Sequence, residues 1–292
     1  MTDTAADTTA SLPDGTHLDR VALRVGSLDA TVPFYRDVVG LAVDRDDQAG
    51  EARLLAADGA ALVVLIEDPD APARPADAAG LFHLAVRVPD RPALAGALAR
   101  VRDHGTLTGA SDHLVSEALY LRDPEGNGVE IYRDRPREEW AETADGQRDI
   151  RTLPLDLDDL AGARESGSET PARVPAGTDV GHVHLEVADL ARATDFYVDG
   201  VGFALENDGY DGAAFVAAGG YHHHLGLNSW NGRSAPAGED RGLAWYELVV
   251  PDEAALAALR DRLAARDQSV ETVGDELRFD DPDGIAVRAR VA

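Results

Sequence analysis

Residues 19–43 read DRVALRVGSLDATVPFYRDVVGLAV, and residues 181–205 repeat the same pattern as GHVHLEVADLARATDFYVDGVGFAL. Each stretch predicts a strand with alternating apolar residues, a short turn, a helix that carries Phe-Tyr, and a glycine that ends the helix. The two stretches are offset by 162 residues at every landmark, as from Tyr35 to Tyr197 and from Gly40 to Gly202. Such regular self-similarity indicates a repeated architecture.

A second kind of unit also occurs twice with the same offset. GLFHLAVRVPD begins at Gly80 and GLAWYELVVPD begins at Gly242, and an amphipathic helix follows each of them. Each unit closes with strands around an Asp-Pro-acidic-Gly turn, at 123–126 and 281–284. The chain therefore holds four modules in two tandem pairs. We predict a disordered acidic tail at 1–16, an N-terminal domain at 17–136, a linker at 137–176 and a C-terminal domain at 177–292.

The composition restricts the classes of partner and ligand. The formal net charge is −27, and all 27 basic residues are arginine because the chain has no lysine. Such a surface repels nucleic acid and anionic membranes, and it favours a cytoplasmic protein in a high-salt, halophilic cytosol. No apolar run is long enough to span a membrane, and the N-terminus lacks the pattern of a secretion signal. With no cysteine in the chain, any metal must be held by His, Asp or Glu.

Four modules of the order strand, helix and three strands resemble the vicinal oxygen chelate superfamily, the group of glyoxalases, bleomycin-resistance proteins and extradiol dioxygenases. The resemblance implies an α+β fold in which two βαβββ modules combine into a cupped mixed sheet with a divalent metal in the cup. In that family, modules of one kind supply one ligand from the first strand. Their partners supply one from the first strand and one from the last.

The positions that match these ligands divide the modules into two sets. Modules one and four offer Arg20, Trp245 and Arg288, which do not bind metal. Modules two and three offer His83, Glu130 and His182, which are the two histidines and one carboxylate that suit Fe(II), with Mn(II) as an alternative. This split predicts that module two pairs with module three, within one chain or between two chains.

His184 follows two residues after His182 and shares its face of the strand. It either supports the metal site or is a strand histidine paired elsewhere.

The run DHLVSEALYLRDPEGNGVEIY, residues 112–132, resembles the extradiol dioxygenase signature. Carried over from that family, Tyr120 would hydrogen-bond the bound substrate and His113 would support it. The Asp-Pro turn should bring Tyr120 and Glu130 onto neighbouring strands.

A second motif is GGYHHHLGLN, residues 219–228. A strand here would place His222 and His224 on one face and His223 on the other. The resemblance makes His223 the candidate acid–base, with His222 or His224 as the fallback.

Together these features predict an extradiol dioxygenase of the catechol 2,3-dioxygenase type. It would act in aromatic catabolism, inserting O2 into a small aromatic diol next to the hydroxyls. One alternative is a glyoxalase-type metal-dependent isomerase or lyase, whose sites usually have a fourth ligand, Glu or Gln, on the strand that reads YHHHLGLN here. The other is a metal-free protein that sequesters an aromatic molecule. Because the sheet edges of this fold often pair, a homo-oligomer is also expected.

Overall fold

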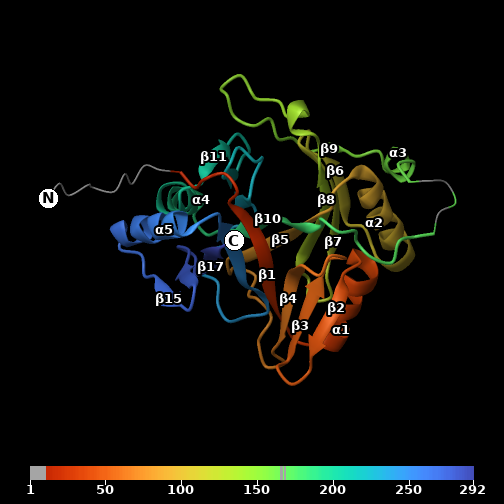
Figure 1. The fold of residues 1–292 in the computed structure, drawn as a ribbon, viewed down its shortest axis with the longest axis horizontal. Helices are drawn as coiled ribbons and strands as arrows, with labels where there is room; N and C mark the ends of the chain where they lie inside the picture. The colour runs from red at the N-terminus through yellow and green to blue at the C-terminus, as the bar shows by residue number, and fades with distance from the viewer. Residues whose placement is uncertain (1–10, 165–166, 168) are drawn as a thin grey trace.

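The computed structural model describes residues 11–164, 167 and 169–292. Strands lie at the centre of the molecule, with helices α4 (Leu190–Asp195) and α5 (Glu253–Ala265) on one side and α1 (Leu28–Pro33) and α2 (Arg91–His104) on the other (Figure 1). The α+β class is therefore confirmed.

Four βαβββ modules follow one another along the chain, as the repeat predicts. Module one continues from β1 (His17–Val25) and α1 through η1 (Phe34–Val39), β2 (Ala42–Asp46), β3 (Glu51–Leu55) and β4 (Ala61–Glu67). Module two has β5 (Gly80–Arg87), α2, β6 (Gly109–Asp112), β7 (Ser116–Arg122) and β8 (Gly128–Asp134). Module three has β10 (Asp179–Glu186), α4, η3 (Phe196–Val201), β11 (Ala204–Asn207), β12 (Ala213–Ala217) and β13 (Leu225–Asn228). Module four has β14 (Gly242–Val250), α5, β15 (Glu271–Val273), β16 (Glu276–Asp280) and β17 (Ala286–Val291).

The modules form two mixed sheets, and each sheet takes one module from each half of the chain. The first sheet has the order β15-β16-β17-β14-β1-β4-β3-β2, which combines modules four and one. The second has the order β11-β12-β13-β10-β5-β8-β7-β6-β9, which combines modules three and two. In each sheet the first strands of the two modules pair antiparallel, β1 with β14 and β10 with β5. The inferred pairing of module two with module three is therefore present within a single chain.

Consecutive modules are joined by other contacts, which explain two of the repeated motifs. The helix of module one passes into the π-helical turn η1 and ends at Gly40, whose φ of 93° is left-handed. This turn buries Tyr35, whose hydroxyl donates to Asp123 Oδ2 of the Asp-Pro turn at 3.0 Å. Tyr197 donates to Asp281 in the same way at 2.9 Å. The Phe-Tyr and Asp-Pro motifs thus link the two modules of each tandem pair. Whether 17–136 and 177–292 each fold by themselves stays a prediction.

The segment predicted as a linker contains ordered structure. It includes η2 (Arg137–Glu139), β9 (Leu153–Pro154) and α3 (Leu157–Ala161), and β9 pairs with β6 at the edge of the second sheet. Trp140, Ile150 and Leu160 are buried. The Ser/Gly/Pro-rich composition applies only to residues 165–179, whereas the earlier part carries apolar residues that bury themselves.

Part of the predicted tail is also packed. Residues 1–10 lie outside the described residues, but Leu12 is buried and its N–H donates to the Gly202 carbonyl at 2.7 Å. The described chain therefore makes tertiary contacts before β1 begins.

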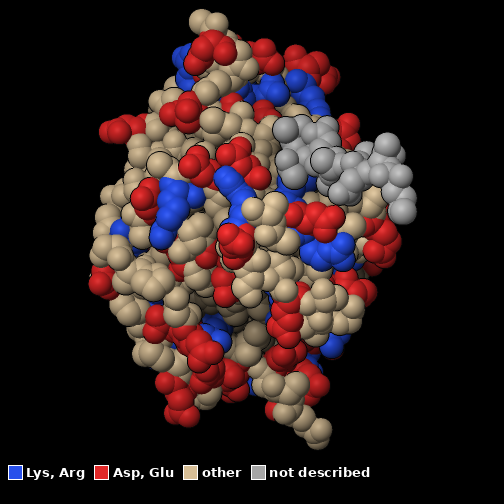
Figure 2. Space-filling model, turned by 90° about the vertical axis from the view of Figure 1, so that its left-hand side faces the viewer, with Lys and Arg blue, Asp and Glu red and all other residues tan. Residues whose placement is uncertain are grey.

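The described surface is rich in carboxylates with arginines among them, as Figure 2 shows for one face. Ion pairs such as Arg45–Asp29, with Nη1 and Oδ1 2.6 Å apart, follow from this distribution. No helix among residues 11–164 and 169–292 is long and apolar enough to cross a membrane.

Candidate metal centre

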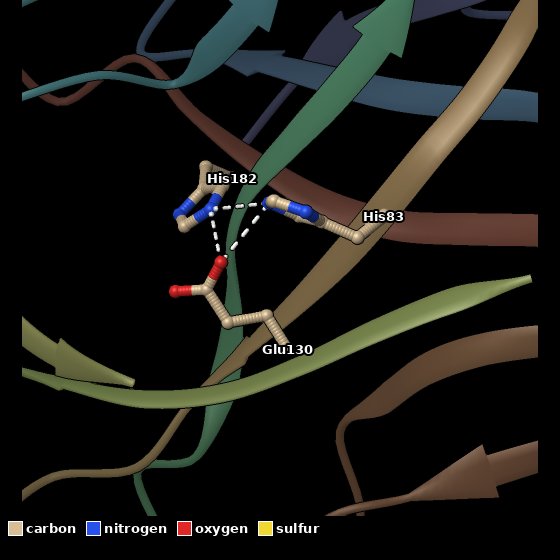
Figure 3. A group of neighbouring side chains, drawn as sticks. All are labelled: His83, Glu130 and His182. Atoms are coloured by element: carbon tan, nitrogen blue, oxygen red, sulfur yellow. Dashed lines mark hydrogen bonds and ion pairs between the residues drawn. The ribbon is translucent and has the colours of Figure 1, made fainter. Parts of the chain in front are cut away.

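The candidate ligands lie on three neighbouring strands of the second sheet. Ala85 of β5 is the register partner of His182 on β10 and of Glu130 on β8, so the three residues form one row across the sheet. His83 precedes Ala85 by two residues and therefore shares its face. Ala85 carries only a methyl group. Figure 3 shows the side chains of His182 and Glu130 pointing toward each other and toward His83.

The ligand atoms converge at distances that suit a metal ion. His83 Nε2 lies 3.0 Å from Glu130 Oε2, His182 Nε2 lies 3.3 Å from the same oxygen, and the two Nε2 atoms are 3.3 Å apart. Two adjacent ligands at right angles, each about 2.1 Å from an ion, are separated by about 3 Å. All three side chains are buried. The distances therefore match three adjacent positions around a divalent cation.

The electrostatics favour the protonation states that a metal requires. Burial acts to raise the pKa of Glu130, but His182 and His83 outweigh it, and the pKa lies well below its usual value. Burial lowers the pKa of His182 to about 4. With its proton on Nδ1, a neutral His182 can direct its Nε2 lone pair to the same point as Glu130 Oε2, where a cation can bind both atoms. Metal binding needs deprotonated ligands, so the donor set fits a divalent ion that accepts nitrogen and oxygen.

The corresponding row of the first sheet is filled by side-chain charges. Glu247 lies 162 residues after Ala85 and stands where the alanine stands in the second sheet. Its Oε1 accepts from Arg20 Nη2 at 2.5 Å. The Arg288 guanidinium lies 3.9 Å from the centre of the Trp245 ring. At the positions of Arg20, Trp245 and Arg288, the structure therefore places an ion pair and a cation–π contact.

Tyr120 and His113 are in contact beside the three candidate ligands. Tyr120 on β7 is the register partner of Glu130 on β8, as the turn between them predicts. Its hydroxyl lies 2.6 Å from His113 Nε2, and His113 Nδ1 lies 2.6 Å from the Arg151 carbonyl. Because a carbonyl only accepts, Nδ1 of His113 is the protonated nitrogen, and in the neutral ring Nε2 accepts from Tyr120. Burial, followed by the negative charge of Glu130, raises the pKa of Tyr120 well above its usual value.

The expected strand alternation of the three consecutive histidines is wrong. They lie in a bend before β13, after Gly219 and Gly220, whose φ angles of 61° and 62° turn the chain. Consequently His222 and His223 do not take opposite faces, and their Nδ1 atoms are 2.7 Å apart. His224 points elsewhere, and its Nδ1 accepts from the Ala218 N–H at 3.1 Å. Two adjacent glycines that allow left-handed backbone were the signal in the sequence for this bend.

His223 reaches the candidate ligands, and its ring centre lies 4.2 Å from that of His182. His184 lies on the same side, with its ring centre 4.9 Å from that of His83. Both are buried, and burial lowers the pKa of each well below its usual value. His184 Nε2 has no hydrogen-bond partner within the part of the chain that the structure describes.

A cavity of about 180 Å³ opens beside these groups. Besides the six predicted site residues and His184, its walls include the largely apolar side chains of Phe82, Ile150, Tyr210, Phe215 and Trp230. These wall residues could not be assigned from the sequence. Ile150 comes from the segment predicted as a linker, and Trp230 follows β13 in a loop.

The comparisons with known proteins agree with this architecture. The model of the glyoxalase/bleomycin resistance protein/dioxygenase superfamily matches residues 17–131 and 179–289. A protein of Bacillus subtilis (strain 168) named catechol-2,3-dioxygenase is 40% identical over 279 residues, covering 93% of this chain and 96% of that protein.

Two solved structures share the fold at low sequence identity. A putative dioxygenase from Bacillus subtilis has a TM-score of 0.63 at 14% identity, covering 97% of this chain and 86% of that one. Glyoxalase I from Zea mays has a TM-score of 0.58 at 15% identity, covering 95% of this chain and 92% of that one. With family matches in both halves and a relative that spans nearly the whole chain, this protein belongs to the glyoxalase/bleomycin resistance protein/dioxygenase superfamily.

Proposed function

We propose that this chain is an extradiol dioxygenase that cleaves a catechol ring next to the two hydroxyls. The observation that carries the proposal is the convergence of His83, Glu130 and His182 at one wall of a cavity that Tyr120 and His223 also line. The relative named catechol-2,3-dioxygenase supports the same reaction. The substrates would be a small aromatic diol and O2.

The proposed cofactor is Fe(II), held by the two histidines and the glutamate, with Mn(II) as a substitute. When bound, such an ion supplies Lewis acidity toward the diol oxygens and, for iron, redox chemistry toward O2. Three protein ligands leave further coordination positions open for two substrates.

The side chains around the cavity would supply the proton transfer and the binding of the ring. His223 would accept a proton from a catechol hydroxyl, and Tyr120 would hydrogen-bond the bound diol. The walls suit one aromatic ring, since a cavity of about 150 Å³ is enough to hold benzene. Phe215 and Trp230 would exclude water and contact the ring through their faces or edges.

The lining residues favour this reaction over the glyoxalase-type alternative. Glu130 is the one carboxylate among the described residues that line the cavity. The described residues that line the cavity therefore include no further Glu or Gln that could serve as a fourth protein ligand. The remaining positions around an ion would be left to substrates.

The test is to load the purified protein anaerobically with Fe(II) and to measure metal content and catechol-dependent O2 uptake. We expect uptake with a yellow ring-cleavage product, and loss of both metal and uptake in His83→Ala and His182→Ala. The matched control is His104→Ala, because His104 is an exposed residue at the end of α2. Metal binding without uptake across several catechols would favour an isomerase or lyase. A protein that binds no metal would be a binder of aromatic molecules.

A further inference from the structure

A chain of hydrogen bonds runs from the cavity to the end of β8. His223 Nδ1 lies 2.7 Å from His222 Nδ1, and His222 Nε2 lies 2.8 Å from Asp134 Oδ1. The other oxygen, Asp134 Oδ2, accepts from Arg87 Nη1 at 3.0 Å. The Tyr221 hydroxyl also donates to Asp134 at 3.1 Å. The His222 side chain is fully buried, whereas 22% of the Asp134 side chain is exposed.

The partners of Asp134 fix the position of each proton along this chain. Burial acts to raise the pKa of Asp134, but His222 and Arg87 outweigh it, so the pKa is lowered and the group is a carboxylate. A carboxylate only accepts, so His222 must carry its proton on Nε2. Burial lowers the pKa of His222, which keeps this ring neutral and leaves its Nδ1 without a proton. His222 Nδ1 therefore accepts, and His223 Nδ1 must be the donor.

The result is a defined tautomer of His223. With its proton on Nδ1, the neutral ring of His223 has a bare Nε2. His223 lines the cavity, and its Nε2 makes no hydrogen bond within the described part of the chain. A bare nitrogen that faces a diol is what a general base needs, whereas a protonated Nε2 could only donate.

We propose that Asp134 and His222 are positioning residues that hold His223 in the tautomer with its bare Nε2 toward the cavity. Both act through His223 and neither lines the cavity. The arrangement resembles in logic the way a buried aspartate fixes the tautomer of a catalytic histidine in a hydrolase triad, with one more imidazole inserted. Its role in the reaction rests on the proposed function of His223 as base.

The direct test is the protonation state of the His223 ring. The protein is labelled with ¹⁵N-histidine, loaded with diamagnetic Zn²⁺ and observed by NMR, with His223→Gln used to assign the signals. We expect wild-type His223 to be protonated at Nδ1 and bare at Nε2. In Asp134→Asn the amide can donate to His222, which would reverse both tautomers and put the proton on His223 Nε2. A wild-type ring protonated at Nε2, or the same tautomer in both proteins, overturns the proposal.

Kinetics of the Fe(II)-loaded protein separate positioning from a structural role. We expect Asp134→Asn to lower kcat at least about tenfold with little change in KM. This loss should not exceed the factor of about 10²–10⁴ that is expected when the base itself is removed in His223→Gln. His222→Leu should match Asp134→Asn, and His222→Gln should recover part of kcat because its amide oxygen can accept from His223 Nδ1. The matched control is Tyr221→Phe, which removes a different donor to Asp134 and should keep kcat.

The outcomes distinguish this proposal from the proposed function. If the tautomer reverses as expected but kcat is unchanged in both Asp134→Asn and His223→Gln, the positioning stands and the assignment of His223 as base fails. If His223→Gln abolishes turnover while Asp134→Asn keeps it, the base role stands and the positioning role in the reaction is overturned.

Discussion

Removal of Arg20 should destabilise the fold without touching the candidate metal centre. The side chain of Glu247 is fully buried, and it is paired with Arg20 Nη2 at 2.5 Å and Arg290 Nε at 3.2 Å. Breaking a buried pair from one side costs about 3–5 kcal/mol because a buried charge is left behind. Arg290 remains after the change, and 32% of the Arg20 side chain is exposed. We therefore expect Arg20→Ala to lower the free energy of unfolding by about 2 kcal/mol.

The pH dependence has a sign that follows from the pKa of Glu247. Burial acts to raise this pKa, but the hydrogen bond from Arg20 leads the interactions that lower it below its usual value. A carboxyl with a lowered pKa stabilises the fold above its unfolded pKa, and this stability is lost as the pH falls through the folded pKa. Without Arg20 the advantage shrinks, so the difference between wild type and Arg20→Ala should be largest near pH 7 and smaller near pH 4.

Urea unfolding of wild type, Arg20→Ala, Glu247→Ala and the double variant at both pH values measures these terms. Glu247→Ala reproduces the alanine of the second sheet, and in the double variant it should recover part of the stability lost in Arg20→Ala. Fe(II) content should stay at the wild-type level throughout. A loss below about 0.5 kcal/mol for Arg20→Ala, or a double variant that is no more stable than Arg20→Ala, would refute the reasoning, because surface changes fall in that range.

Three further predictions test other parts of the structure. In Gly181→Ala the new Cβ would overlap Tyr132 Oη, so we expect overpacking to lower the free energy of unfolding by about 1–3 kcal/mol. Metal binding, measured by titration, should also weaken because the centre of the Tyr132 ring lies 4.8 Å from that of His182. Burial raises the pKa of Asp281 to about 6. The stability that this group contributes is therefore present below its unfolded pKa and is lost as the pH rises toward 6. Urea unfolding at several pH values should show a smaller dependence of stability on pH in Asp281→Asn. The net charge of −27 makes the folded chain repel itself. Raising NaCl from about 0.1 M to 1 M shortens the Debye length from about 10 Å to 3 Å and screens this repulsion, so wild type should unfold at a higher urea concentration. An unchanged urea midpoint would count against a fold adapted to high salt.

The repeat made much of the fold accessible from the sequence. Tyr35 and Tyr197, each followed five residues later by a glycine, located the helices and their ends. The candidate ligands could be identified because His83, Glu130 and His182 stand at matched places in the modules. Their convergence in one chain, within 4.8 Å, depends on the cross-pairing of modules, which the complementary sets of side chains had indicated.

What the sequence could not provide depends on loops and on tertiary contacts. The bend at 219–224 replaced an expected strand because Gly219 and Gly220 adopt left-handed backbone, and only then can His222 contact His223. Ile150 reaches the cavity from a segment whose path is set by packing, since Trp140 and Ile150 belong to a buried cluster with Tyr221 and Phe215. Periodicity identifies strands and helices, but it does not indicate where such a segment crosses the fold.

The two sheets differ at one position in the middle of corresponding rows, which carry the proposed metal site in one sheet and a structural ion pair in the other. In the second sheet Ala85 is the small residue between His182 and Glu130, whose Nε2 and Oε2 atoms lie 3.3 Å apart and could share a cation. In the first sheet Glu247 fills the same position and takes the guanidinium of Arg20. Each row thus combines buried negative charge with a positive partner, which is an arginine in one sheet and, as proposed, a metal ion in the other. The residue that distinguishes the two rows is thus an alanine, and an alanine carries no functional group by which a sequence motif could reveal it.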